Sequence, residues 1–174
     1  MKEIKGDLWN TVCDAVCIST NGFVKRDGSC VMGRGCAKQA LAYFPTMPWD
    51  LGSLIKNNGN NVHHMLNYGG VDILSFPVKP VSFTFSGALD CKHIVKHMRY
   101  KFKPGDEVPG WACVADVDII KRSAEQLVKM ADTYGWKKVL IPRVGCGAGE
   151  LSWADVKPVL NEVLDDRFVA VTFK

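Results

Sequence analysis

Two glycine-rich segments carry the clearest chemical signal in the sequence. Residues 32–37 read MGRGCA and precede a segment of helical composition, while residues 143–149 read RVGCGAG and follow an apolar run. Glycines let a backbone approach a ligand closely, and free backbone N–H groups in a loop or at a helix start attract anions. Together the segments predict a diphosphate site, although each alone also fits a loop whose glycines serve turn geometry. Neither matches the patterns GxxxxGK[ST] or GxGxxG.

Two polar residues follow predicted strands in the same way. Asp7 comes after a short first strand, where its carboxylate could accept a hydrogen bond from an amine or could cap a turn. Asn21 ends an apolar, β-branched run and opens an Asn-Gly turn. Ligands of open α/β sheets bind at the carboxyl ends of the strands. We therefore expect these residues and the glycine segments to meet at one site.

The elements that would position these residues alternate between strands and helices. Strands are predicted at 1–5, 14–20, 62–67, 71–78, 138–142 and 166–173, and helices at 37–44, 48–57, 116–134 and 152–164. The longest helix has the clearest apolar face, with Asp116 or Asp118 as its cap and Gly135 after its end. Ser152 would cap the last helix, which Pro158 could kink. This alternation predicts a three-layer α/β fold with a mixed or parallel sheet.

Residues 80–115 fit neither pattern. They mix glycine, proline, lysine and aromatic residues without a clear period, so we predict an irregular excursion from the fold. Basic residues are densest at 92–103, which we interpret as a solvated surface. The alternative is a nucleic-acid contact, whose affinity would fall steeply with salt. His93 and His97 would share a face only if this segment were helical.

Composition places the chain among ordinary globular proteins. It has 174 residues, 47% of them hydrophobic and 23% charged, with a net charge of +4, which favours one domain and excludes global disorder. The small positive charge suits an acidic ligand without requiring nucleic acid. None of the seven cysteines forms a CxxC pair, so no zinc or thioredoxin-type site is predicted. This cysteine usage favours a reducing cytoplasmic location. We expect a monomer. We expect no membrane association, because no apolar run approaches about 18 residues.

The order of these motifs resembles the macro domain, an ADP-ribose-binding α/β/α module. GDL at 6–8, a strand ending in Asn21, GRGCA at 33–37 and PRVGCGAGELSW at 142–153 follow one another as in that family. The last of these motifs is the most specific. The resemblance implies a three-layer α/β/α fold with a mixed central sheet.

The resemblance covers nearly the whole chain. It implies a single macro domain over 1–174 with an irregular insertion at about 80–115. The loop at 32–45 is similar to that of one branch, which contains the terminal ADP-ribose glycohydrolases and the antitoxins that remove ADP-ribose from DNA.

Binding roles follow from the resemblance residue by residue. Asp7 would hold the adenine amino group, assisted by the backbone at Leu8, and Asn21 would contact the distal ribose. Phe173 would stack on the adenine, although a core position is the simpler interpretation. The diphosphate would be wrapped on one side by Met32, Gly33, Arg34, Gly35 and Cys36, and on the other by Arg143, Val144, Gly145, Cys146, Gly147, Ala148 and Gly149.

The resemblance also implies a catalytic residue. Residues 73–79, ILSFPVK, are similar to the branch's apolar strand ending in F-P-x-K. Lys79 would then act on the anomeric carbon C1″ of the distal ribose, with Asn21 orienting that ribose. A desolvated lysine can be a nucleophile, and a fixed one can stabilise a leaving group, whereas the simpler interpretation is an exposed charge. The implied reaction removes ADP-ribose from a modified nucleic acid or protein, with no metal and no cofactor.

One departure from the family pattern leaves alternatives open. Gly149 stands where the animal glycohydrolases carry an aspartate, as it also does in the DNA-acting antitoxins. No residue is then assigned the general-acid role, and Glu150 could take it only if its side chain turns inward. The alternatives to hydrolysis are a phosphatase for ADP-ribose 1″-phosphate and a non-catalytic ADP-ribose reader. Four tryptophans are interpreted as packing residues: Trp49, Trp111, Trp136 and Trp153.

Overall fold

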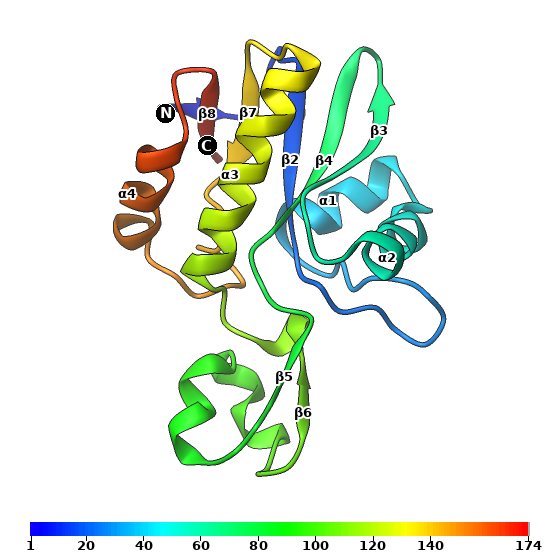
Figure 1. The fold of residues 1–174 in the computed structure, drawn as a ribbon, viewed down its shortest axis with the longest axis vertical. Helices are drawn as coiled ribbons and strands as arrows, with labels where there is room; N and C mark the ends of the chain where they lie inside the picture. The colour runs from blue at the N-terminus through cyan, green and yellow to red at the C-terminus, as the bar shows by residue number, and fades with distance from the viewer. Residues whose placement is uncertain (174) are drawn as a thin grey trace.

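The computed structural model describes residues 1–173, in which a six-stranded sheet carries helices on both faces (Figure 1). In order across the sheet, the strands are β1 (Lys2–Gly6), β8 (Phe168–Phe173), β7 (Val139–Pro142), β2 (Ala15–Thr20), β4 (Val71–Pro77) and β3 (His63–Tyr68). Neighbouring strands are parallel except β3 and β4, which pair antiparallel. The sheet is therefore mixed, as the sequence and the resemblance predicted.

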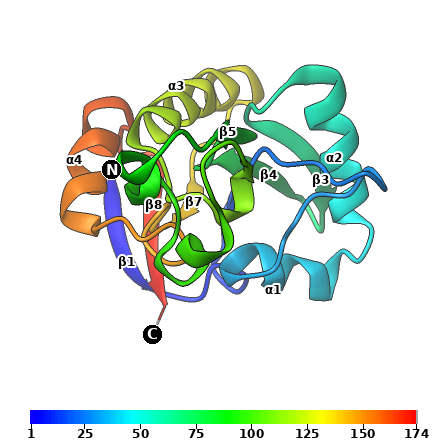
Figure 2. The same cartoon turned by 90° about the horizontal axis from the view of Figure 1, so that it is seen from below.

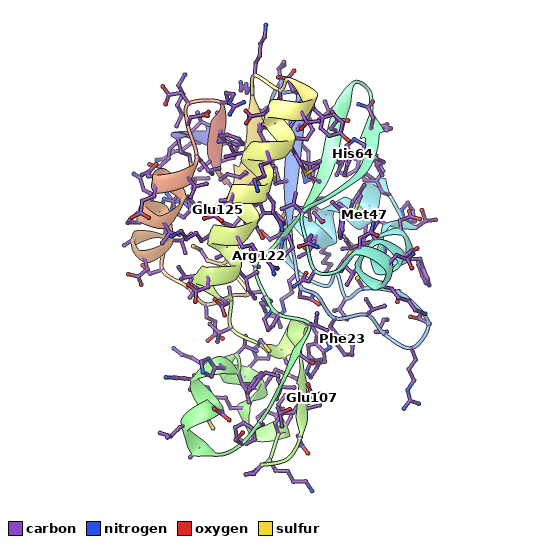
Figure 3. The ribbon with its side chains drawn as sticks, viewed as in Figure 1. Phe23, Met47, His64, Glu107, Arg122 and Glu125 are labelled. Atoms are coloured by element: carbon purple, nitrogen blue, oxygen red, sulfur yellow. The ribbon has the colours of Figure 1, made fainter. Side chains whose placement is uncertain are left out.

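Alternate residues of the central strands face opposite helix layers. The flanking helices are α1 (Gly35–Tyr43), α2 (Met47–Asn58), α3 (Val117–Tyr134) and α4 (Trp153–Val163). In β2, Ala15 and Cys17 pack in the core under α3 and α4, while Val16 and Ile18 pack under α1 and α2 with the fully buried Met47 (Figure 3). Figure 2 shows α3 on one side of the sheet and α1 on the other. The three-layer prediction is confirmed.

The helix boundaries follow local signals in the sequence. Asp116 caps α3, because its carboxylate accepts a hydrogen bond from the N–H of Asp118 at 2.7 Å. Gly135 ends that helix in the left-handed region, with φ of 72°. Ser152 caps α4 by accepting from the N–H of Ala154 at 3.2 Å. Within residues 1–173, no helix is long and apolar enough to cross a membrane.

Residues 80–115 form a lobe beyond the carboxyl ends of the strands (Figure 1). Its elements are β5 (Ser82–Thr84), β6 (Glu107–Pro109) and the 3₁₀ helices η1 (Ala88–His93), η2 (Lys96–Lys101) and η3 (Gly110–Ala112). It has its own core of Phe85, Ile94, Val95, Met98, Val108, Ala112 and Cys113. The predicted irregular excursion is thus a small ordered unit, with short elements that leave no helical or strand period in the sequence.

The neck of the lobe is tightly packed. The N–H of Gly110 donates to the carbonyl of Val81 at 2.8 Å. A Cβ at Gly110 would lie 1.8 Å from the carbonyl oxygen of Pro80, so only glycine fits where the two ends of the lobe cross. This packing holds the lobe against the end of β4.

Candidate functional site

A cavity of about 610 Å³, here called the main cavity, lies between the two glycine segments and the lobe. It opens at the carboxyl ends of β2, β4 and β7, where ligands of such sheets bind. Twelve predicted site residues line it: Asn21, Met32, Gly33, Arg34, Gly35, Cys36, Lys79, Arg143, Gly145, Gly147, Ala148 and Gly149. The fold therefore brings together segments that are far apart in the sequence.

A second hollow of about 260 Å³ adjoins the main cavity. The two share the lining residues Gly35, Cys36, Pro142 and Arg143. Leu8 and Phe173 line only the second hollow. Phe173 is 73% exposed, so it is a surface side chain and not the core residue of the simpler interpretation.

Three predicted site residues line neither space. The Asp7 carboxylate accepts hydrogen bonds from the N–H of Trp9 at 2.8 Å and from Nδ2 of Asn10 at 2.6 Å. Val144 is fully buried in the core, and Cys146 packs against the same core. The side chains of these residues thus contact the protein itself in this structure.

The first glycine segment leads into the start of α1. Arg34 precedes the helix with an extended backbone, and Gly35 then adopts φ of 58°. The first turn of α1 contains no acidic residue, so no carboxylate within that turn compensates the positive end of the helix dipole. Burial raises the pKa of the Cys36 thiol, whose sulfur accepts from the N–H of Ser19 at 3.4 Å. Cys36 therefore remains protonated and serves packing.

The second glycine segment folds back on itself. The N–H of Leu151 donates to the carbonyl of Gly145 at 2.9 Å, and the N–H of Glu150 donates to that of Gly147 at 3.0 Å. A Cβ at Gly149 would lie 2.5 Å from the carbonyl oxygen of Gly145 and 2.6 Å from Cβ of Ala115. The absence of an aspartate at this position therefore follows from the packing, which leaves no space for any side chain.

Lys79 is the buried cation of the main cavity. It is only 8% exposed, and its Nζ donates to the carbonyls of Trp111 at 3.3 Å and Ala148 at 3.2 Å. Burial is the main cause that lowers the pKa of Lys79, and the nearby charge of Arg34 lowers it further. Cys113 and Glu150 act in the opposite direction. The simpler interpretation of an exposed strand-end charge is wrong.

The backbone that carries Lys79 is held from both sides. The N–H of Val78 donates to the carbonyl of Thr20 at 2.9 Å, and its own carbonyl accepts from the N–H of Asp116 at 2.8 Å. The buried hydroxyl of Ser123 donates to the carbonyl of Pro77 at 2.7 Å. The end of β4 is thus fixed by β2 and α3, which positions the lysine.

Asn21 lines the main cavity and also organises the loop beyond β2. Its Nδ2 donates to the carbonyl of Val31 at 3.0 Å, and its Oδ1 accepts from the N–H of Phe23 at 2.9 Å. The side chain therefore ties the start of this loop to its end, close to the first glycine segment.

Glu150 does not turn into the main cavity. It adopts φ of 63°, a left-handed conformation that non-glycine residues rarely adopt. Its Oε2 accepts from the N–H of Lys96 at 2.9 Å, at the start of η2. The carboxylate thus connects the second glycine segment to the lobe, and the inward orientation that a general acid would need is not observed.

The contribution of the lobe to the site is not apparent from the sequence. Five lobe residues line the main cavity: Val95, His97, Met98, Lys101 and Trp111. The tryptophan had been interpreted as packing and the basic segment as a solvated surface. The available signal was positional, because an insertion that starts directly after Lys79 must begin at the site. Among residues 1–173, no group of three or more His, Cys, Asp or Glu side chains could hold a metal ion.

Comparison with known proteins rests on structure. No family model and no curated protein matches the sequence. The macrodomain of Mycobacterium tuberculosis DarG superposes with a TM-score of 0.66 at 19% identity, over 98% of this chain and 95% of that one. The macrodomain of Thermus aquaticus DarG gives 0.65 at 18% identity, over 98% and 95%.

A further match is Thermosipho africanus DarTG in complex with ADP-ribose. Its TM-score is 0.68 at 16% identity, and the match covers 99% of this chain and 41% of that one. At such identities the likeness concerns the fold, and the agreement extends over nearly the whole chain. The protein therefore has the macrodomain fold that its motifs resemble.

Proposed function

We propose that the protein binds ADP-ribose in the main cavity and hydrolyses the bond at C1″ of the distal ribose. The product would be free ADP-ribose, released from a modified nucleic acid or protein. The observation that carries this proposal is Lys79, a buried cation between the two glycine segments that forms no ion pair within residues 1–173. A buried charge is costly unless it is paired, so the site is suited to an anionic ligand.

The proposed ligand would span both spaces. Its diphosphate would lie between residues 32–37 and 143–149, near the start of α1 and the guanidinium of Arg34. The adenine would occupy the second hollow beside Leu8 and Phe173. Asp7, which precedes Leu8 in the sequence, would hold the adenine amino group. A structure that contains this fold, Thermosipho africanus DarTG, is a complex with ADP-ribose, which supports ADP-ribose as the class of ligand.

The distal ribose would then lie near Asn21 and Lys79. The lowered pKa of Lys79 increases the fraction of neutral amine, which is the form that can attack C1″. In its protonated form the same group would stabilise negative charge on the departing atom. Asn21 would orient the ribose, since this residue lines the main cavity.

One observation favours a second candidate, the non-catalytic reader. No carboxylate side chain of residues 1–173 lines the main cavity, so the acid that assists departure in the animal glycohydrolases has no counterpart at Gly149. A reader would bind ADP-ribose and leave every conjugate intact.

The test is a substrate panel. The protein is incubated with ADP-ribosylated DNA, ADP-ribosylated protein and ADP-ribose 1″-phosphate, and the products are separated by chromatography. Release of ADP-ribose from DNA or protein supports the proposal. Inorganic phosphate from the third compound alone would assign a phosphatase instead. Binding of ADP-ribose without any turnover would assign the reader.

A further inference from the structure

The lobe presents two polar side chains to the main cavity. His97 and Lys101 both belong to η2, and both line the main cavity with the apolar residues Val95 and Met98 and with Trp111. This part of the cavity wall comes entirely from the lobe and not from the six-stranded sheet. A ligand that fills the main cavity would therefore lie beside this wall.

The backbone on either side of His97 is held in place. Val95 and Met98 are 3% and 6% exposed, and the N–H of Val95 donates to the carbonyl of Ala112 at 3.0 Å. The N–H of Lys96 donates to the Glu150 carboxylate at 2.9 Å, which ties η2 to the second glycine segment. The imidazole is exposed, so it is free to exchange protons with a ligand or water.

The charges around this imidazole are almost all positive. The charged groups that line the main cavity or belong to η2 are Arg34, Lys79, Arg143, Lys96, Arg99 and Lys101, with Glu150 bound to the N–H of Lys96. The Cys36 thiol stays protonated because burial raises its pKa. Arginine never loses its proton in proteins, and histidine is the side chain whose ordinary pKa lies near neutrality. His97 is thus the lining residue of residues 1–173 whose ring carries both a proton donor and a proton acceptor.

We infer that His97 is the general acid and base of this site, supplied by the lobe in place of an aspartate in the glycine loop. The inference rests on the proposed hydrolysis. As the bond from C1″ to the leaving atom breaks, the bonding pair stays on that atom, which takes a proton from the imidazolium. The neutral imidazole then takes a proton from the water that adds to C1″. One water is consumed, and the imidazolium and Lys79 are restored whether the lysine attacks C1″ or only stabilises charge.

The test compares His97→Gln and His97→Ala with His93→Gln, on the panel substrate that the wild-type protein cleaves fastest. His93 is a matched control, because it lies in the same lobe against Phe83, with ring centroids 5.9 Å apart, and does not line the main cavity. We expect both His97 variants to lose kcat on the order of 10²-fold, while their ADP-ribose affinity and melting temperature stay close to wild type. The control should keep wild-type kcat.

Two further readouts separate proton transfer from a structural role. The ratio of wild-type to His97→Gln kcat should vary with pH, because only the wild-type protein carries the group that transfers the proton. Added imidazole should partly restore His97→Ala but not Lys79→Ala. Unchanged kcat in the His97 variants, or a ratio that does not vary with pH, would overturn the inference and leave the hydrolase standing. A wild-type protein that cleaves nothing in the panel would overturn both.

Discussion

The two ends of the central sheet differ in whether their charged side chains have partners within the protein. At the amino end of β4, the Asp72 carboxylate accepts hydrogen bonds from His64 at 2.7 Å, Asn67 at 3.0 Å and Trp136 at 2.8 Å. The rings of His64, Tyr134 and Trp136 stack in series, with centroid separations of 5.4 and 4.8 Å. Figure 3 shows His64 at a distance from the lobe, and the polar groups of this end satisfy one another.

At the carboxyl end, the cations that line the main cavity form no ion pairs with the carboxylates of residues 1–173. Arg34, Lys79 and Arg143 line the main cavity, and none of them forms an ion pair within residues 1–173. Arg143 instead lies over the ring of Trp153, at 5.3 Å from its centroid. The amino end thus satisfies its charges within the protein, whereas the carboxyl end carries cations without ion pairs, the arrangement that the proposed anionic ligand requires.

Loss of the buried lysine should give the largest effect. We expect Lys79→Ala to reduce turnover by about 10³-fold, because the side chain proposed to act at C1″ is gone, while ADP-ribose still binds. The measurement is single-turnover release of ADP-ribose together with a calorimetric titration. Lys92→Ala is the control, since Lys92 is exposed on the lobe and does not line the main cavity. Full activity of Lys79→Ala would remove the catalytic assignment.

Substitutions at two glycines of the second glycine segment should affect fold stability and ligand binding separately. Gly149→Ala brings a Cβ within 2.6 Å of the protein, so we expect it to destabilise the fold by about 1–3 kcal/mol. A Cβ at Gly147 meets nothing within 4 Å, so Gly147→Ala should change stability by less than about 0.5 kcal/mol. Gly147 lines the main cavity, and its variant should instead weaken ADP-ribose binding. Urea denaturation and calorimetry measure the two effects, and equal stabilities would contradict the packing argument.

A substitution at the amino end of the sheet should lower stability and leave turnover unchanged, the reverse of the effect expected for Lys79→Ala. Asp72→Asn removes acceptors from the ring donors, and we expect a loss of about 1–2 kcal/mol in unfolding free energy with turnover unchanged. Glu125→Gln, on the exposed face of α3, should change neither (Figure 3). A loss of turnover in a stably folded Asp72→Asn protein would show that the two ends are coupled.

The smallest expected effect is a pH dependence of stability. Burial acts to raise the pKa of Asp72, but the hydrogen bonds from Asn67, His64 and Trp136 outweigh it and lower this pKa. A carboxylate with a lowered pKa in the folded state stabilises the protein above its ordinary pKa, and this contribution is lost as pH falls through the folded value. Below about pH 4, wild type should therefore lose more stability than Asp72→Asn. Parallel curves in acid denaturation would contradict this.

Much of the fold could be predicted because its signals are local. The β2 run is apolar on both faces, as a central parallel strand must be, and Asp116 and Gly135 mark the ends of α3. Glycine segments at strand ends likewise predicted most of one wall of the main cavity. These features depend on residues that are near one another in the sequence.

The rest depends on contacts that no local pattern reveals. The lobe consists of three-residue strands and 3₁₀ helices around a small core, which have no long period. The use of Glu150 to hold η2 arises from the meeting of the second glycine segment with the lobe, 54 residues apart. The position of Lys79 likewise depends on its hydrogen bonds to the carbonyls of Trp111 and Ala148, which only the folded chain brings together.

A calorimetric titration of the wild-type protein with ADP-ribose tests the central claim most directly. The claim is that the carboxyl end of the sheet is an anion site that binds the diphosphate of a ligand. We predict saturable binding of one ADP-ribose per chain, weakened by Gly147→Ala and unaffected by Asp72→Asn. Absence of binding heat at any temperature tried, or equal binding losses in both variants, would contradict it.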